Sequence, residues 1–74
     1  MHLNELKKGQ KCKLVNINSI GKLKQKLLDM GFIFGASIEV VREAPLYDPM
    51  ELRIHNYLIS LRRSEANLLE VEVL

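Results

Sequence analysis

Short runs in which apolar and polar residues alternate are the main pattern of this 74-residue chain. A period of two places the apolar side chains on one face of a β-strand. Such runs occur at positions 9–17, 37–42, 50–54, 57–62 and 69–73. About five strands in so short a chain leave unpaired edges unless the sheet curls and closes on itself. The pattern therefore predicts a mainly β fold, a small and partly open β-barrel.

One segment after the first run has a helical period instead. Its apolar residues are three, four and three positions apart: Ile20, Leu23, Leu27 and Met30. This spacing places them on one stripe of an α-helix of about three turns. Ser19 is a good N-cap residue before the stripe, and Gly31 suits the left-handed conformation that ends many helices. We therefore expect one helix inserted after the first strand of a barrel of SH3-like size.

Three local features modify this pattern. Cys12 and Leu14 alternate on one face of the first strand whereas Ile17 falls on the other, so a bulge or burial on both faces is expected. Residues 44–49 contain two prolines and cannot hold a sheet ladder. Asn56 tolerates positive φ and is expected to turn the hairpin between the third and fourth strands.

Composition limits the class of protein. Hydrophobic residues make up 47% and charged residues 27%, which is typical of a folded domain, and we expect one domain over residues 1–74. The longest stretch without an acid, Lys or Arg is residues 30–38, whereas a membrane-spanning helix needs about 20 apolar residues. No apolar segment follows the first charges, so no secretory leader is expected. The lone Cys12 cannot form an internal disulfide, which favours a reducing cytoplasm.

Charge is distributed unevenly along the chain. Residues 1–26 hold seven Lys and one acid, whereas residues 27–74 hold four Arg and eight acids. A basic face of this kind could meet nucleic acid or an acidic protein surface, or its lysines could be ordinary solvated side chains. Residues 1–26 contain neither Arg nor an aromatic residue, which argues against nucleic acid. RNA binding remains an alternative.

The sequence offers no recognisable catalytic or metal-binding motif. Cys12 lies in an apolar strand, His2 near the terminus and His55 at the predicted hairpin tip, so no nucleophile has an obvious base. The segment 31–35 lacks the Lys-Ser/Thr of a phosphate-binding loop. Paired Cys or His residues at metal-ligand spacing are also missing. We expect no enzyme, cofactor or dedicated metal site, although a weak metal site shared between two chains remains open.

The apolar residues exceed what one small core can bury. Phe32, Ile33 and Phe34 are consecutive, so they cannot all point inward. Leu46 and Tyr47 lie within the proline-containing break. Such residues could form an exposed patch that marks a partner site, or the two Phe side chains could plug the open end of the barrel.

Four motifs in the same order resemble the FeoA family (ferrous iron transport protein A). They are Leu27–Phe32 (Leu-Leu-Asp-Met-Gly-Phe), Gly35–Val40 (Gly-Ala-Ser-Ile-Glu-Val), Ala44–Pro49 (Ala-Pro-Leu-Tyr-Asp-Pro) and Leu58–Ala66 (Leu-Ile-Ser-Leu-Arg-Arg-Ser-Glu-Ala). The resemblance covers about residues 1–73. Two positions differ from the family pattern, which often has Gly where this chain has Tyr47 and Asn56.

The resemblance implies an SH3-like barrel with a helix between its first two strands. It also implies a small cytosolic, non-enzymatic accessory of bacterial ferrous iron uptake that docks on the cytosolic part of the GTP-hydrolysing permease FeoB. The apolar loop residues and the basic helix suggest which side chains make this contact. The expected contacts are Met30, Phe32, Leu46, Tyr47 and Pro49, with Lys22 and Lys26 assisting electrostatically.

Two other functions remain open beside this one. The first is a transition-metal sensor or carrier whose ligands are shared between chains, and the second is a small RNA-binding barrel. Self-association is also possible, and the sequence does not decide whether docking activates or restrains GTP hydrolysis.

Overall fold

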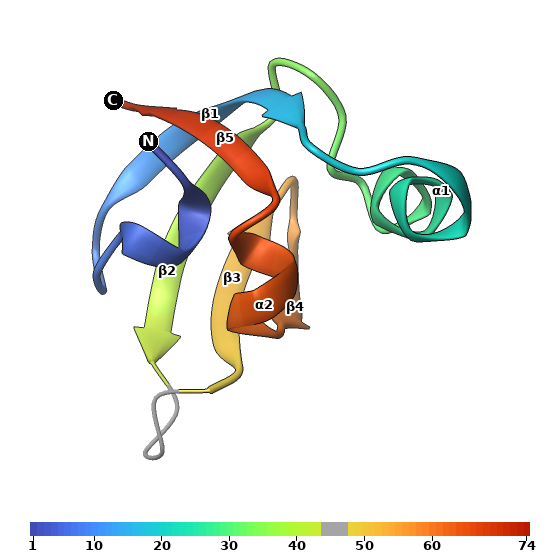
Figure 1. Cartoon of the computed structure of the whole chain (residues 1–74). Helices are drawn as coiled ribbons and strands as arrows, with labels where there is room; N and C mark the ends of the chain where they lie inside the picture. Colours follow the sequence, from blue (N-terminus) through green and yellow to red (C-terminus); the bar gives the residue numbers. More distant parts are fainter. Residues whose placement is uncertain (44–47) are drawn as a thin grey trace.

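Figure 1 shows the computed structural model of the chain, which describes residues 1–43 and 48–74. Its strands are β1 (Lys11–Ile17), β2 (Ser37–Glu43), β3 (Met50–Ile54), β4 (Tyr57–Leu61) and β5 (Leu69–Val73). They form one antiparallel sheet in the order β4-β3-β2-β1-β5. The sheet curls around its apolar face (Figure 1), so the predicted mainly β, SH3-like barrel is confirmed.

Two irregularities bend the long strands. The pairing of β1 with β5 shifts register between Leu14 and Asn16, and this shift lets Ile17 point into the core like Cys12. The bulge predicted in the first strand is therefore confirmed. A second shift lies between Val40 and Arg42 in the pairing of β2 with β3. Bulges increase local twist and bend a strand, which favours closure of the small sheet.

The inserted helix begins later than the sequence suggested. Helix α1 covers Gly21–Asp29, and its N-cap residue is Ile20, which has no side-chain capping bond. The expected Ser19 cap is wrong, because Gly21 has a φ of +69° that turns the chain and leaves Ile20 outside the helix with 87% of its surface exposed. Leu27 is fully buried as predicted. Gly31, with a φ of +102°, follows the helix as predicted.

Helix α1 lies to one side of the barrel (Figure 1), and a hydrogen bond joins its C-terminal end to the β3–β4 hairpin. The Tyr57 hydroxyl donates a 2.8 Å hydrogen bond to the backbone oxygen of Met30, the C-cap residue. The left-handed residue of the hairpin turn is His55, with a φ of 55°, and not Asn56 as expected. Among the described residues only His55 and four glycines have positive φ, so the turn needs this conformation at its first position alone.

Two short helices complete the structure: η1 (Leu3–Glu5) and α2 (Arg63–Ala66). Asp48 Oδ1 accepts a 2.9 Å hydrogen bond from the backbone N–H of Arg63, the first residue of α2. The Arg63 side chain donates to the backbone oxygen of Asn4 at 2.8 Å. Lys26 of α1 pairs with Glu65 at 2.9 Å. The four-residue α2 thus joins three segments that are far apart in the sequence.

The core contains apolar side chains from every strand and helix described. Fully buried members with the largest side chains include Leu3, Leu6, Leu14, Leu27, Phe32, Ile38, Met50, Leu52, Ile54, Leu61 and Leu69. The predicted alternation of the third strand is therefore confirmed. Cys12 is also buried, and desolvation raises the pKa of its thiol from 9.0 to about 11. No described helix is long and apolar enough to cross a membrane.

Replacing Gly31 with Ala is expected to destabilise the fold more than replacing Gly35 with Ala. Both positions have positive φ, so each substitution costs about 1–2 kcal/mol of backbone strain. Only at Gly31 would the new methyl group also collide with the Tyr57 hydroxyl. Urea unfolding measures the difference, and the Tyr57→Phe background should reduce the excess cost at Gly31. Equal losses at the two glycines would contradict this role of Tyr57.

The free energy of unfolding should also decrease as the pH rises, because the buried Cys12 thiol becomes ionised. Its pKa is raised in the folded state, so folding favours the protonated thiol and the contribution is complete below pH 9.0. The unfolding free energy should then fall by about 2–3 kcal/mol as the pH rises from 9.0 to about 11. The Cys12→Ala variant lacks this term but keeps all other titrating groups. Denaturant unfolding of both proteins at several pH values measures the difference, and parallel pH profiles would contradict the burial argument.

Candidate functional site

The chemistry-bearing residues are kept apart in the described structure. Cys12 lies in the core, whereas His2 belongs to the N-terminal segment and His55 to the hairpin tip. His2 interacts with Glu5, because the His2 backbone N–H donates to the carboxylate at 2.8 Å. No cluster of three His, Cys, Asp or Glu residues able to hold a metal occurs in residues 1–43 and 48–74.

The connection between α1 and β2 presents the clearest apolar surface. Phe32 is fully buried, whereas Ile33 and Phe34 are 49% and 59% exposed. The connection is well anchored, because the Gly35 N–H donates to the Leu14 oxygen at 2.8 Å and the Leu14 N–H donates to the Ala36 oxygen at 2.9 Å. The prediction that these three apolar residues cannot all be buried is confirmed. Ile33 and Phe34 thus stand on a fixed loop beside β1.

The expected role of Phe32 as a surface contact needs correction. Its backbone N–H donates to the Leu27 oxygen at 3.1 Å, immediately after the turn at Gly31. This bond folds the chain back on the end of α1 and directs the Phe32 ring into the core. Phe32 supports the apolar loop from inside, and its neighbours provide the exposed surface.

The other expected contacts do not form one surface. Met30 is half-buried at the end of α1, close to Ile54 and Tyr57 through the Tyr57 hydrogen bond. Pro49 is also half-buried, but it precedes Met50, which pairs with Leu61 at the other end of β3. A five-residue strand is about 13 Å long at about 3.3 Å per residue, so Met30 and Pro49 lie toward opposite ends of the barrel.

The remaining two expected loop contacts cannot be placed. Leu46 and Tyr47 fall in residues 44–47, outside the residues that the structure describes. Their predicted contact with a partner stays a prediction. Asp48, which follows them, is exposed and paired with Arg62 at 3.7 Å as well as bonded to the start of α2.

The two helix lysines differ in their surroundings. Lys22 is exposed, one helical turn before Lys26 on the same side of α1. Lys26 forms the ion pair with Glu65 of α2 and remains largely exposed. Exposed pairs of this kind contribute little to stability, about 0–1 kcal/mol. Both lysines are therefore available to shape the electric field on this side of the molecule.

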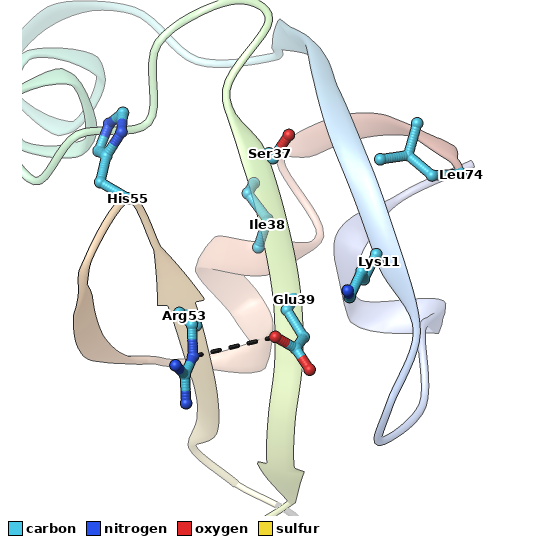
Figure 2. Close-up of a pocket in the computed structure, with 7 residues that line it drawn as sticks. All are labelled: Lys11, Ser37, Ile38, Glu39, Arg53, His55 and Leu74. Atoms are coloured by element: carbon cyan, nitrogen blue, oxygen red, sulfur yellow. Dashed lines mark ion pairs between the residues drawn. The ribbon is translucent and has the colours of Figure 1, made fainter.

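A groove of about 280 Å³ lies on the outer face of the sheet (Figure 2). Its lining residues are Lys11, Ser37, Ile38, Glu39, Arg53, His55 and Leu74. Glu39 on β2 lies between Lys11 on β1 and Arg53 on β3, and the Arg53 Nε is 3.9 Å from its carboxylate. None of these residues was predicted from the sequence to bind a partner or ligand, and His55 was expected only at the hairpin tip. Their alternating charges are typical of a solvated sheet face.

Comparison with known proteins places this fold in a family. The FeoA domain model matches residues 1–73. A Fe(2+) transport protein A/Fe(2+) transporter FeoB fusion protein of Porphyromonas gingivalis is 42% identical over all 74 residues, which span 9% of its length. The solution structure of iron(II) transport protein A of Clostridium thermocellum has a TM-score of 0.94 and 44% identity, over 99% of this chain and 45% of that one.

A more distant structure supports the description of the fold. The zinc complex of FeoA from Stenotrophomonas maltophilia, described as a procaryotic SH3 domain protein, has a TM-score of 0.85. The two sequences are 22% identical over 97% of this chain and 89% of that one, so the similarity supports the fold alone. The four motifs, the barrel with its inserted helix and the matched residues agree, and the chain belongs to the FeoA family.

Proposed function

We propose that this chain is a non-enzymatic accessory of ferrous iron uptake that docks on the cytosolic part of a FeoB permease and modulates it. The observation that carries the proposal is the Porphyromonas gingivalis relative, whose name joins an Fe(2+) transport protein A to a FeoB transporter in one polypeptide. A short covalent link between two modules gives an effective concentration on the order of millimolar. Separate chains need a docking surface to reach the same association, and such docking would hold this chain in the cytoplasm beside the membrane.

The apolar loop between α1 and β2 is proposed as the first contact area. Ile33 and Phe34 are exposed on an anchored loop, and the half-buried Met30 lies at the adjoining end of α1. Aromatic side chains and Met are enriched in the cores of protein interfaces. Because the loop is already held by backbone hydrogen bonds, little conformational entropy is lost when a partner covers it. Phe34 is the proposed anchor.

Lys22 and Lys26 are proposed to assist the encounter and not to supply most of the affinity. Charged groups at the rim of an interface mainly raise the association rate, and salt screens them over about 10 Å at 0.1 M. Pro49, at the opposite end of the barrel, is proposed as a second contact, and the proposed contacts of Leu46 and Tyr47 fall outside the described residues. Amide shifts in a labelled chain titrated with the FeoB cytosolic part would separate the two areas.

Replacing Phe34 with Ala is expected to weaken binding to the FeoB cytosolic part of the same organism by about tenfold or more. Tenfold corresponds to about 1.4 kcal/mol, a common loss for an aromatic anchor at an interface. Isothermal titration calorimetry measures the affinity. The Val73→Ala variant removes an exposed apolar side chain on β5 and should keep the wild-type affinity. Unchanged binding by a folded Phe34→Ala variant would move the docking surface away from this loop.

Replacing Lys22 with Gln is expected to slow association several-fold at about 20 mM salt and to have little effect at about 500 mM salt, because screening removes the attraction. Surface plasmon resonance gives the two rate constants separately. The Lys8→Gln variant changes an exposed lysine before β1 and serves as the control of equal charge. A loss that persists at high salt would indicate a direct contact and contradict a steering role.

A further inference from the structure

The two edges of the sheet differ in how their backbone groups are used. The order β4-β3-β2-β1-β5 makes β4 and β5 the edge strands. At the β5 edge, the Val71 N–H donates to the Met1 oxygen at 2.8 Å, and His2 forms a bridge with Glu70. The N-terminal segment thus covers part of that edge. Within residues 1–43 and 48–74, β4 pairs with β3 alone.

The register of the hairpin identifies the backbone groups that point away from β3. Ile54 and Tyr57 are partners on either side of a two-residue turn, and hydrogen-bonded partners alternate along an antiparallel pair. Tyr57, Ile59 and Leu61 therefore bond to β3, whereas Leu58 and Ser60 direct their N–H and C=O groups to the open edge. Four backbone hydrogen-bonding groups face outward along this strand.

The same alternation can be checked at the opposite edge. When the same alternation is continued from β3 through β2 to β1, the backbone groups of Lys11 point toward β5. Those of Val71 on β5 then point away from β1. The structure shows the Lys11 oxygen bonded to the Leu74 N–H at 2.9 Å and the Val71 N–H bonded to Met1. Both observations agree with the assignment, which supports the outward direction of Leu58 and Ser60.

The side chains of β4 provide little protection for this edge. Natural edge strands commonly carry charges or Pro that prevent pairing with another chain. The β4 sequence, Tyr-Leu-Ile-Ser-Leu, contains neither. Leu58 is 59% exposed, Ser60 is exposed and Ile59 is half-buried. An uncharged strand with free backbone groups can accept an extended segment by strand addition, in which the backbone gives affinity and the alternate side chains give selectivity.

Charge around the edge indicates the chemistry of the occupant. The Tyr57–Met30 and Lys26–Glu65 contacts place α1 beside the hairpin and α2. Helix α1 and residues 50–66 together carry six Lys or Arg and three acids. Arg53 and Arg62 are also paired with Glu39 and Asp48, so the excess positive charge lies on α1. A second copy of this chain would bring two such basic surfaces together, which is unfavourable. A segment with acidic residues beside an apolar centre would be complementary.

We propose that β4 is a strand-addition site for an extended segment of the partner, apolar at its centre and flanked by acidic residues. This inference rests on the proposed function, since the segment is taken to belong to the cytosolic part of FeoB. The site adjoins the apolar loop near α1, because Tyr57, the first residue of β4, is bonded to Met30. Docking would thus combine backbone pairing along β4 with side-chain contacts at Phe34.

The test uses the full chain and full-length FeoB of the same organism in nanodiscs. Ser60→Pro removes an outward N–H donor without removing a bond to β3, and should weaken binding about tenfold or more. Ser60→Ala keeps the donor and should bind normally. Val73→Pro removes an outward donor from the other edge and should also bind normally. Hydrogen exchange should show slower exchange at Leu58 and Ser60 in the complex.

Charge variants keep the test decisive should proline disturb the fold. Leu58→Glu and Leu58→Lys remove the same apolar side chain, so an acidic segment should bind the Glu variant several-fold more weakly than the Lys variant. Wild-type binding with unchanged exchange at Leu58 and Ser60 would overturn strand addition and leave the proposed function intact. An absence of binding by the wild-type chain would overturn both. Slower exchange at these amides with rising concentration of this chain alone would identify a second copy as the occupant and overturn the proposal.

Discussion

The burial of one apolar face by a single curled sheet is the constraint on which this structure depends. A chain of 74 residues has no second layer large enough to cover a flat sheet. The register shifts after Leu14 and after Val40 bend the strands around their own side chains. Phe32, η1 and Leu27 then fill the remaining openings of the barrel. The apolar loop, the inserted helix and the open edge strand, which are the main surfaces proposed for binding, lie where this closure ends.

Patterns that repeat within one element could be predicted from the sequence. The alternation of Met50, Leu52 and Ile54, the bulge before Ile17 and the end of α1 at Gly31 are local consequences of side-chain type. Features that depend on turns or on distant residues could not be predicted from the sequence. The chain turns at Gly21, which exposes Ile20, and the hairpin places its left-handed residue at His55 and not at Asn56.

The candidate site shows the same division between local and distant information. The surplus of apolar residues at 32–34 correctly predicted an exposed surface, but only the bond to Leu27 decides that Phe32 is the buried member. Met30 and Pro49 were both expected as contacts but do not lie in one patch, because the register of β3 separates them. The open edge at Leu58 and Ser60 is also a property of register, which a single sequence does not display.

The four residues of α2 have a consequence for how the fold is completed. An isolated turn of helix is unstable in water, because nucleation costs more than one hydrogen bond returns. Its supports come from Asp48, Asn4 and Lys26, which are separated by most of the chain. The order of this helix therefore depends on its neighbours and not on its own four residues. It reports on how the barrel, the N-terminal segment and α1 pack together.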